Sequence, residues 1–248
     1  MIIVNDWVGR LGNNIIQLLN IVNIAILHEH NISFNVKHKF FDLSIIQEYF
    51  KKNTNSIKIT DRYNFFYKNK IPYLNGKNAE NAENAENTEN VKKILNEAFL
   101  INDIIKLPEN DLVIHLRSGD IFSSNPHPKY VPSPLSYYIK EINKLKYQTI
   151  HIVCEDMNNP VLTELLNIYT NSVYHKNTLE NDIKIILGAS NVIFSVGSFI
   201  PSLMIFSDNI KYIHPEAKKL NDLEDYYKIM IPWKNTKIQR DYILNYKY

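Results

Sequence analysis

The chain has 248 residues and a nearly neutral charge, and both facts limit the classes of protein it can be. Apolar residues make up 45% of it and charged residues 22%, so it can bury a sizeable core and is neither disordered nor fibrous. The formal net charge of +2 gives no sign of a nucleic-acid-binding protein or of an acidic partner. We therefore expect a globular protein with one large domain or two small ones.

Cysteine content and the N-terminal residues bear on the compartment. Cys154 is the single cysteine, so no disulfide forms within the chain and a reducing compartment is expected. The N-terminus lacks the basic region, apolar stretch and cleavage site of a signal peptide. No window approaches the roughly 20 apolar residues that span a bilayer. These features predict a cytoplasmic protein without a transmembrane segment.

The N-terminal part of the chain alternates strand and helix patterns, which predicts a βαβαβ arrangement, half of a doubly wound domain. The expected elements are a strand at 2–4, a helix at 15–30, a strand at 32–36, a helix at 43–50 and a strand at 56–60.

Gly9 and Gly12 lie in the loop between the first strand and the first helix. A strand, a glycine loop and a helix are typical of a contact with an anion or a nucleotide sugar, because free amides at a helix N-terminus favour negative charge. The loop lacks the third glycine of the dinucleotide-binding motif. A tight turn without a ligand is the alternative interpretation.

Residues 78–90 form a low-complexity tract in which the triplet Asn-Ala-Glu recurs. The tract has little to bury, so we expect a surface insertion or a frayed helix end without a function, whose deletion is tolerated. Helical periodicity then predicts a helix over 91–105, ending before Pro108.

Polar residues gather where the next strand ends. Residues 111–114 predict a short buried strand, and His115, Arg117, Gly119 and Asp120 follow it directly. Ligands of open α/β sheets bind at the carboxyl ends of strands, and an arginine there presents a fork of donors that suits a phosphate oxygen. Asp120 can hold the guanidinium or a substrate hydroxyl. An Arg/Asp ion pair that merely closes a corner is the alternative.

The second half shows the same alternation of strands and helices, after a proline-rich loop at 125–134. The expected elements are a helix from Ser133-Pro134 to 145 with Ser133 as its cap, a strand at 149–154, a helix from Asn159-Pro160 to 169, a strand at 172–174, a helix capped by Thr178 and running to 187, a strand at 191–196, a helix at 199–206 and a strand at 210–213.

Two of these strands end in residues that suit the binding of a ligand. Glu155 and Asp156 follow the strand at 149–154, and a turn of small residues at 195–198 leads into a helix, which predicts a phosphate cradle. The alternation in both halves predicts an α/β protein with two parallel-sheet domains that face each other. We place an N-terminal domain at 1–107, a C-terminal domain at 108–220, and a tail at 221–248 that packs back across the structure.

Four elements together, by their order and spacing, resemble the alpha-1,2-fucosyltransferase family, which is glycosyltransferase family 11, and the wider fucosyltransferase group with an H-x-R-x-x-D element. The matches are a glycine loop at Gly9 to Asn14 with Gln17, the central motif at His115, Arg117, Gly119 and Asp120, a carboxylate-bearing strand end at Val153 to Asp156, and a late element at Asp182 with Ser195 to Phe199. Ser118 stands where the family has a second arginine, Asn14 replaces a glutamine, and the chain is shorter than most members.

The resemblance implies a GT-B-like fold of two doubly wound, Rossmann-like domains across a cleft. It also implies an inverting, metal-independent transfer of L-fucose from GDP-fucose to a glycan hydroxyl, O-2 of galactose, with the GDP-sugar as co-substrate and no cofactor. The sequence contains no D-x-D motif and no spacing typical of a metal site. Three alternatives stay open: the same fold with another nucleotide-sugar donor, a non-catalytic glycan-binding relative, and a purely structural α/β protein. The oligomeric state is left open.

The site residues are predicted partly from the chemistry of their side chains and partly from this resemblance. In the catalytic group, Arg117 stabilises the leaving diphosphate, Asp120 holds Arg117, and His115 orients Arg117, contacts the diphosphate or is a structural histidine. Donor-binding residues are Gly12, Asn13, Glu155, Asp156, Asp182, Ser195, Gly197, Ser198 and Phe199; acceptor-binding residues are Asp6, Trp7 and Tyr130. Solvated strand-end charges (Glu155 and Asp156), an ordinary helix cap (Asp182) and core packing (Trp7 and Tyr130) are the alternatives, and Asp6 is a candidate general base.

Overall fold

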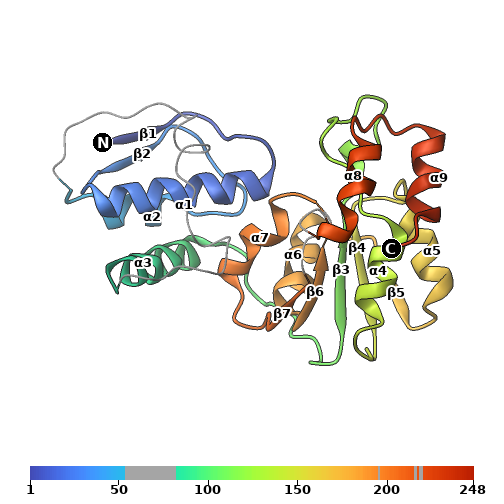
Figure 1. The fold of residues 1–248 in the computed structure, drawn as a ribbon. Coiled ribbons are helices and arrows are strands. Elements are labelled where there is room, and N and C mark those ends of the chain that lie inside the picture. The colour runs from blue at the N-terminus through green and yellow to red at the C-terminus, as the bar shows by residue number, and fades with distance from the viewer. Residues whose placement is uncertain (54–81, 195, 215–216, 218–219) are drawn as a thin grey trace. The chain divides into compact units, whose positions relative to one another are not determined.

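The computed structural model describes residues 1–53, 82–194, 196–214, 217 and 220–248 (Figure 1). Its contacts divide the chain into two compact units. The first unit comprises 1–102 and 198–206, and the second comprises 103–197 and 207–248. Both contain parallel strands connected through helices, which confirms the predicted α/β class. The segment 198–206 belongs to the first unit, whereas the sequence analysis assigned it to the C-terminal domain.

A small parallel sheet and a group of helices form the first unit. Strand β1 pairs with β2 so that Ile2 lies opposite Ile32, and α1 connects them. Figure 1 shows α1 between this sheet and α3, which it contacts. The elements are β1 (Ile2–Val4), α1 (Leu11–Leu27), β2 (Ile32–Phe34), α2 (Leu43–Phe50), α3 (Ala82–Ala98), α7 (Phe199–Leu203) and the 3-10 turn η4 (Met204–Phe206).

Three helices of this unit differ from the prediction. Helix α7 ends at Leu203 and is followed by the 3-10 turn η4, where one helix over 199–206 was expected. Helix α1 begins at Leu11, because Gly12 and the asparagines after it take helical conformation. Helix α3 covers 82–98 and not 91–105, so part of the Asn-Ala-Glu tract is helical, as the helix propensity of Ala and Glu allows. The predicted strand at 56–60 and residues 78–81 lie outside the described residues.

The second unit is built on a five-stranded parallel sheet with the order β5-β4-β3-β6-β7. The chain therefore moves outward from β3 to β5 and then returns to the other side of β3. This reversal makes the carboxyl ends of β3 and β6 a topological switch point, where α/β sheets bind ligands. The strands are β3 (Leu112–Leu116), β4 (Ile150–Cys154), β5 (Ser172–His175), β6 (Asn191–Phe194) and β7 (Tyr212–Ile213).

The core of this unit lies between the sheet and the helices that pack on it. Alternate residues of β3 and β4, among them Leu112, Ile114 and Ile152, share one buried cluster with side chains of α4, α5 and α8. The helices are α4 (Leu135–Ile142), α5 (Pro160–Ile168), α6 (Leu179–Gly188), α8 (Glu224–Met230) and α9 (Lys237–Asn245), with 3-10 turns η3 (Gly119–Phe122) and η6 (Asn221–Leu223).

Of the two predicted caps, Thr178 was right and Ser133 was wrong, and Asn159, predicted only to start its helix, also caps it. Asn159 accepts a hydrogen bond from the Val161 amide at the start of α5, and Thr178 accepts one from Asn181 at the start of α6. Helix α4 begins after Pro134 without a side-chain cap, because the Ser133 hydroxyl pairs with that of Tyr227.

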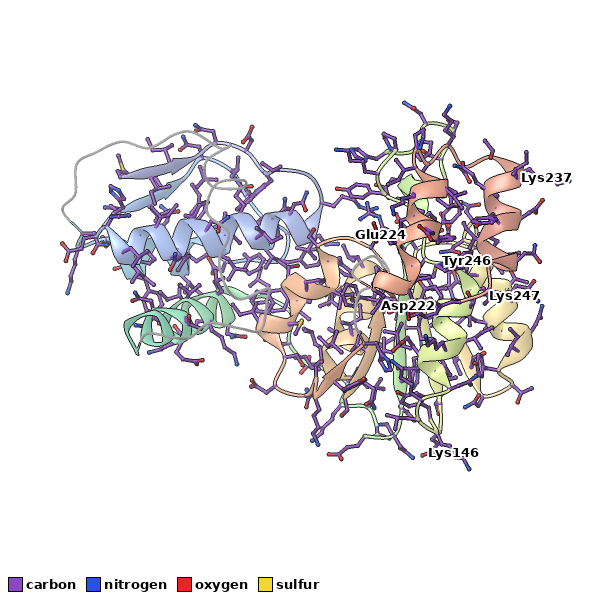
Figure 2. The ribbon with its side chains drawn as sticks, viewed as in Figure 1. Lys146, Asp222, Glu224, Lys237, Tyr246 and Lys247 are labelled. Carbon is purple, nitrogen blue, oxygen red and sulfur yellow. The ribbon has the colours of Figure 1, made fainter. Side chains whose placement is uncertain are left out.

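The C-terminal residues complete the second unit. Helix α9 contacts α4 and α5, and Figure 2 shows Lys237 at its solvent-facing start and Tyr246 just after its end. Trp233 is buried and donates from Nε1 to the Ile121 carbonyl at 2.6 Å. No helix within the described ranges is both long enough and apolar enough to cross a membrane.

Candidate functional site

The carboxyl end of β3 places Arg117 at the switch point of the second unit. Strand β3 is longer than predicted and includes His115, which lies opposite Val153 of β4 and Phe194 of β6. The expectation that His115 follows the strand was therefore wrong. Arg117 is the first residue beyond the strand, so its backbone is no longer paired with the neighbouring strands.

Within the described part of the chain, Asp120, Tyr130 and Gly197 lie next to the guanidinium of Arg117. Its Nη2 donates to the Asp120 carboxylate at 2.9 and 3.3 Å, and its Cζ lies 4.7 Å from the centre of the Tyr130 ring. Gly197, at φ +117°, lies so close that a side chain there would place Cβ 2.7 Å from Nη1. The Arg117 side chain is 18% exposed, and its buried Nε has no hydrogen-bond partner among the described residues. A fixed cation with unused donor capacity is suited to a phosphate.

Two carboxylates follow β4 and differ in environment. Glu155 is exposed, and its carboxylate lies close to Gly119, where the positive φ of +60° favours glycine. Asp156 is half-buried. Burial raises the pKa of Asp156, but hydrogen bonds from the Ser118 hydroxyl and from Asn158 outweigh that effect, so its pKa lies below the ordinary value.

Asp182 is a buried carboxylate in the first turn of α6, 8% exposed, and Thr178 and not Asp182 caps this helix. The pKa of Asp182 is raised to about 6: burial is the main cause, a hydrogen bond from Asn177 opposes it, and the charge of Glu155 adds to the increase. One of its oxygens, Oδ1, has no hydrogen-bond partner within the described part of the chain. An unpartnered buried acceptor is costly, which is typical of a group kept for a ligand.

The glycine loop of the first unit meets the residues after Gly197. A Cβ on Gly12 would lie 2.7 Å from the amide nitrogen of Phe199, so only glycine permits this approach. The Ser198 hydroxyl donates to Asn13 Oδ1 at 2.6 Å. Gly12, Asn13, Ser198 and Phe199 therefore form one cluster.

Asp6 and Trp7 lie in the loop that precedes α1, and hydrogen bonds to other residues of the first unit fix this loop. Gln17 donates to the Asp6 carbonyl at 3.1 Å and accepts from the Val8 amide at 3.0 Å. The Trp7 indole donates to the Lys37 carbonyl at 2.9 Å and packs edge-on to His38. Burial lowers the pKa of His38 to about 4, so this ring is neutral near pH 7.

The predicted site residues thus fall into two clusters, one in each unit. Arg117, Asp120, Tyr130 and Gly197 are together in the second unit, where Glu155 lies against Gly119, and Ser195 lies outside the described residues. Tyr130, predicted for the acceptor, packs against the Arg117 guanidinium, and its role toward an acceptor stays a prediction. The sequence analysis missed Asn159 as a site residue, although its Asn-Pro pattern was recognised as a helix start. No cluster of three or more potential metal ligands occurs within the described ranges.

Comparison with known proteins gives structural neighbours but no sequence relatives. No protein-family model and no curated protein matches the chain. A structure of POFUT1 in complex with GDP aligns with a TM-score of 0.46 and 10% identity, covering 86% of this chain and 96% of that one. Two structures of POFUT1 with GDP-fucose give TM-scores of 0.45 and 0.43 at 10% and 11% identity, covering 86% of this chain and 97% and 96% of theirs. Because all three scores lie below 0.5, we base the functional proposal on the site itself.

Proposed function

We propose that the chain is a glycosyltransferase whose second unit binds a nucleotide-sugar donor, with the diphosphate at Arg117. The position of Arg117 carries this proposal: it stands at the switch point between β3 and β6, with the glycine-bearing turn after β6 against its guanidinium. A crevice at this point of a doubly wound sheet is where nucleotides bind. Asp120 and Tyr130 hold the guanidinium without using its Nε donor.

The proposed reaction is transfer of L-fucose from GDP-fucose to a glycan hydroxyl, O-2 of galactose, with inversion and without a metal, on a GT-B-like fold. The acceptor oxygen forms a bond to the anomeric carbon, the bond from that carbon to the diphosphate breaks, and the acceptor proton passes to a base. Asp6 is our candidate for that base. Charge grows on the departing diphosphate, and a preorganised arginine stabilises that charge. The choice of fucose and of the linkage rests on the motif resemblance.

The carboxylates of the second unit are our candidates for the rest of the nucleotide. Asp182 offers an unpartnered buried oxygen, and Glu155 is exposed next to Gly119. Carboxylates accept hydrogen bonds from paired N–H donors of a base or from ribose hydroxyls. In the first unit, Gly12, Asn13, Ser198 and Phe199 are proposed on the donor side and Trp7 on the acceptor side.

A thermal-shift panel with GDP, GDP-fucose, UDP and ADP tests the donor. We expect GDP and GDP-fucose to raise the melting temperature of the wild type, since a ligand at 100 times its dissociation constant stabilises by about 2.7 kcal/mol. Arg117→Ala should abolish the shift. Lys211→Ala is the matched control, because it removes a positive charge that pairs with Glu109 on the surface of the same unit.

The pattern of responses separates the alternatives. Stabilisation by UDP or ADP in place of GDP species would assign another donor. Stabilisation by glycans with no response to any nucleotide would contradict the transferase proposal and favour a glycan-binding protein. Release of GDP from GDP-fucose on addition of galactosides, measured in the presence of EDTA, then tests the transfer itself.

A further inference from the structure

Arg117 and the two residues after it form hydrogen bonds to one turn, the β4–α5 connection at 155–159. The Asn159 amide donates to the Arg117 carbonyl at 3.0 Å. The Ser118 hydroxyl donates to Asp156 Oδ1, and the Gly119 amide also donates to the Asp156 carboxylate. The three consecutive residues that set the direction of the arginine side chain are therefore each bonded to this turn.

The Asp156 carboxylate is fully engaged by the protein. Besides Ser118 and Gly119, it accepts from the Asn158 backbone amide at Oδ1 and from the Asn158 side chain at Oδ2, both at 2.9 Å. A carboxylate has about four lone-pair positions, so these four donors leave it little capacity for a ligand. This differs from Asp182, whose Oδ1 has no partner among the described residues.

Burial makes these bonds hard to replace with water. Ser118 is 1% exposed and Asn159 is 2% exposed. Asn159 uses its oxygen to cap α5 through the Val161 amide and its nitrogen to hold the Arg117 carbonyl, so one side chain links the helix start to the arginine. Loss of either partner would leave a buried polar group unsatisfied.

We propose that Asp156 is a positioning residue, which acts on the nucleotide through Arg117 and does not contact it. This inference rests on the proposed function and changes the role that the sequence suggested for Asp156, that of a donor ligand. It also gives Ser118 a role: where the resembling family has a second arginine, this chain has a short buried hydroxyl that links the arginine loop to Asp156. Small displacements of a catalytic group lower rates strongly, so the linkage matters for function.

A double-mutant cycle tests the proposal, with GDP as the probe and isothermal titration as the measurement. The variants are Asp156→Ala, Arg117→Ala and the double variant. We expect Asp156→Ala to weaken GDP binding on the order of tenfold in the wild-type background, and to have less than about a twofold effect when Arg117 is already absent. If Asp156 contacted GDP directly, the two losses would add in the double variant, and that result would overturn the inference.

Two controls separate positioning from lost stability. Asp111→Ala removes another hydrogen-bonded carboxylate, at the opposite end of β3, and it should lower the melting temperature without changing the dissociation constant of GDP. If Asp156→Ala does not fold, Ser118→Ala takes its place in the cycle, since it removes one bond to Asp156 and creates no buried charge. Additive effects with measurable GDP binding contradict only this inference, whereas a wild type that binds no GDP contradicts the proposed function and this inference with it.

Discussion

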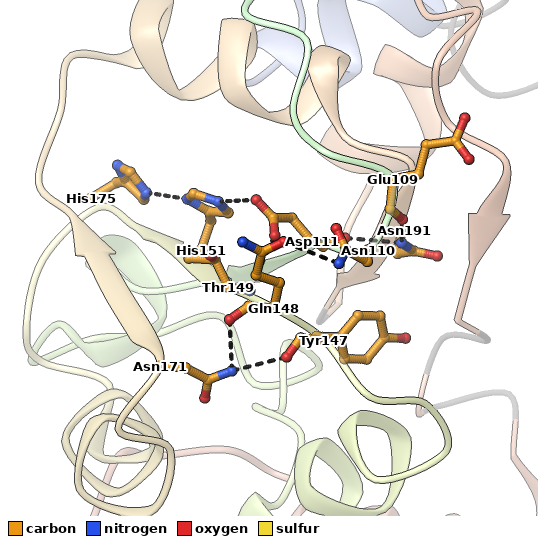
Figure 3. A network of polar contacts seen from close by, with 10 residues as sticks. All are labelled: Glu109, Asn110, Asp111, Tyr147, Gln148, Thr149, His151, Asn171, His175 and Asn191. Carbon is orange, nitrogen blue, oxygen red and sulfur yellow. Dashed lines mark hydrogen bonds and ion pairs between the residues drawn. The ribbon is translucent and has the colours of Figure 1, made fainter.

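The two ends of strand β3 carry similar numbers of polar residues and use them in opposite ways. At the amino end, Asp111 is 4% exposed, and its oxygens accept from the Thr149 amide and pair with His151 at 3.1 Å each. His151 continues to His175 at 2.9 Å (Figure 3). At the carboxyl end, Arg117 keeps a buried polar atom without a partner within the described residues, and so does Asp182 in the first turn of α6.

Asparagines complete the amino-end network. Asn191 donates to the carbonyls of Glu109 and Asp111, and Asn171 donates to those of Tyr147 and Gln148 (Figure 3). These bonds satisfy backbone acceptors where the strands begin. A network in which every polar group has a hydrogen-bond partner stabilises the fold. A buried group without a partner lowers stability, and such a group is expected where a bound ligand supplies the missing hydrogen bond.

The largest expected effect is the loss of donor binding in Arg117→Ala. Removing the Arg117 guanidinium from the switch point should weaken GDP binding by about 10²-fold or more, by analogy with loss of a single oxyanion donor. Stability should change by less than about 1 kcal/mol, because the pair with Asp120 is partly exposed. Titration calorimetry and urea unfolding measure the two quantities, and unchanged GDP affinity would contradict the assignment of the site.

The opposite result is expected at the amino end. Asp111→Ala leaves the Thr149 amide and a His151 nitrogen without their acceptor, which should lower the free energy of unfolding by about 2–4 kcal/mol. GDP affinity of the folded protein should stay within about twofold of the wild type. A large loss of GDP affinity in this variant would show that the two ends of β3 are coupled. It would contradict the view that the amino end serves stability alone.

Asp182, with its pKa of about 6, is expected to lower the stability of the protein at pH 7 and to strengthen GDP binding. A carboxyl whose pKa is raised in the folded state gains stability as the pH falls through the interval from about 6 to its unfolded value near 3.9, so its charged form is destabilising at pH 7. Asp182→Asn should therefore raise the melting temperature at pH 7 and weaken GDP binding.

The pH dependence of binding sharpens this test. GDP affinity of the wild type should fall between pH 7 and pH 5 as Asp182 is protonated, and Asp182→Asn should lack that part of the dependence. The difference between the two proteins separates Asp182 from the titration of the nucleotide itself. Equal pH profiles would argue that Asp182 does not contact the donor.

The smallest effect is expected at His175. Burial lowers the pKa of His175, and the neighbouring His151 lowers it further. A histidine whose pKa is lowered in the folded state takes up a proton on unfolding, so stability falls as the pH drops below about 6.5. His175→Gln should change unfolding in urea at pH 7 by less than about 1 kcal/mol and reduce the loss between pH 7 and pH 5. A variant with the full wild-type pH dependence would assign that loss to other groups.

The sequence predicted what depends on neighbours along the chain. Asn159 and Thr178 cap their helices through bonds to residues two or three positions on, so the local pattern was sufficient. The alternation of apolar segments gave the α/β class, and a polar residue directly after a buried strand indicated the position of Arg117. Local pattern was weakest for helix bounds, as the early start of α3 shows.

Only the tertiary structure decided which of these residues meet. The strand order β5-β4-β3-β6-β7 brings Gly197 against Arg117, and the pairing of β3 with β4 places Asp156 next to Ser118. Motif similarity and carboxylate chemistry suggested that Asp156 binds the donor, but the role we propose for it depends on which of its atoms are already bonded. That is set by contacts between residues far apart in the chain, whose energies arise from packing and burial and leave no periodic signal in the sequence.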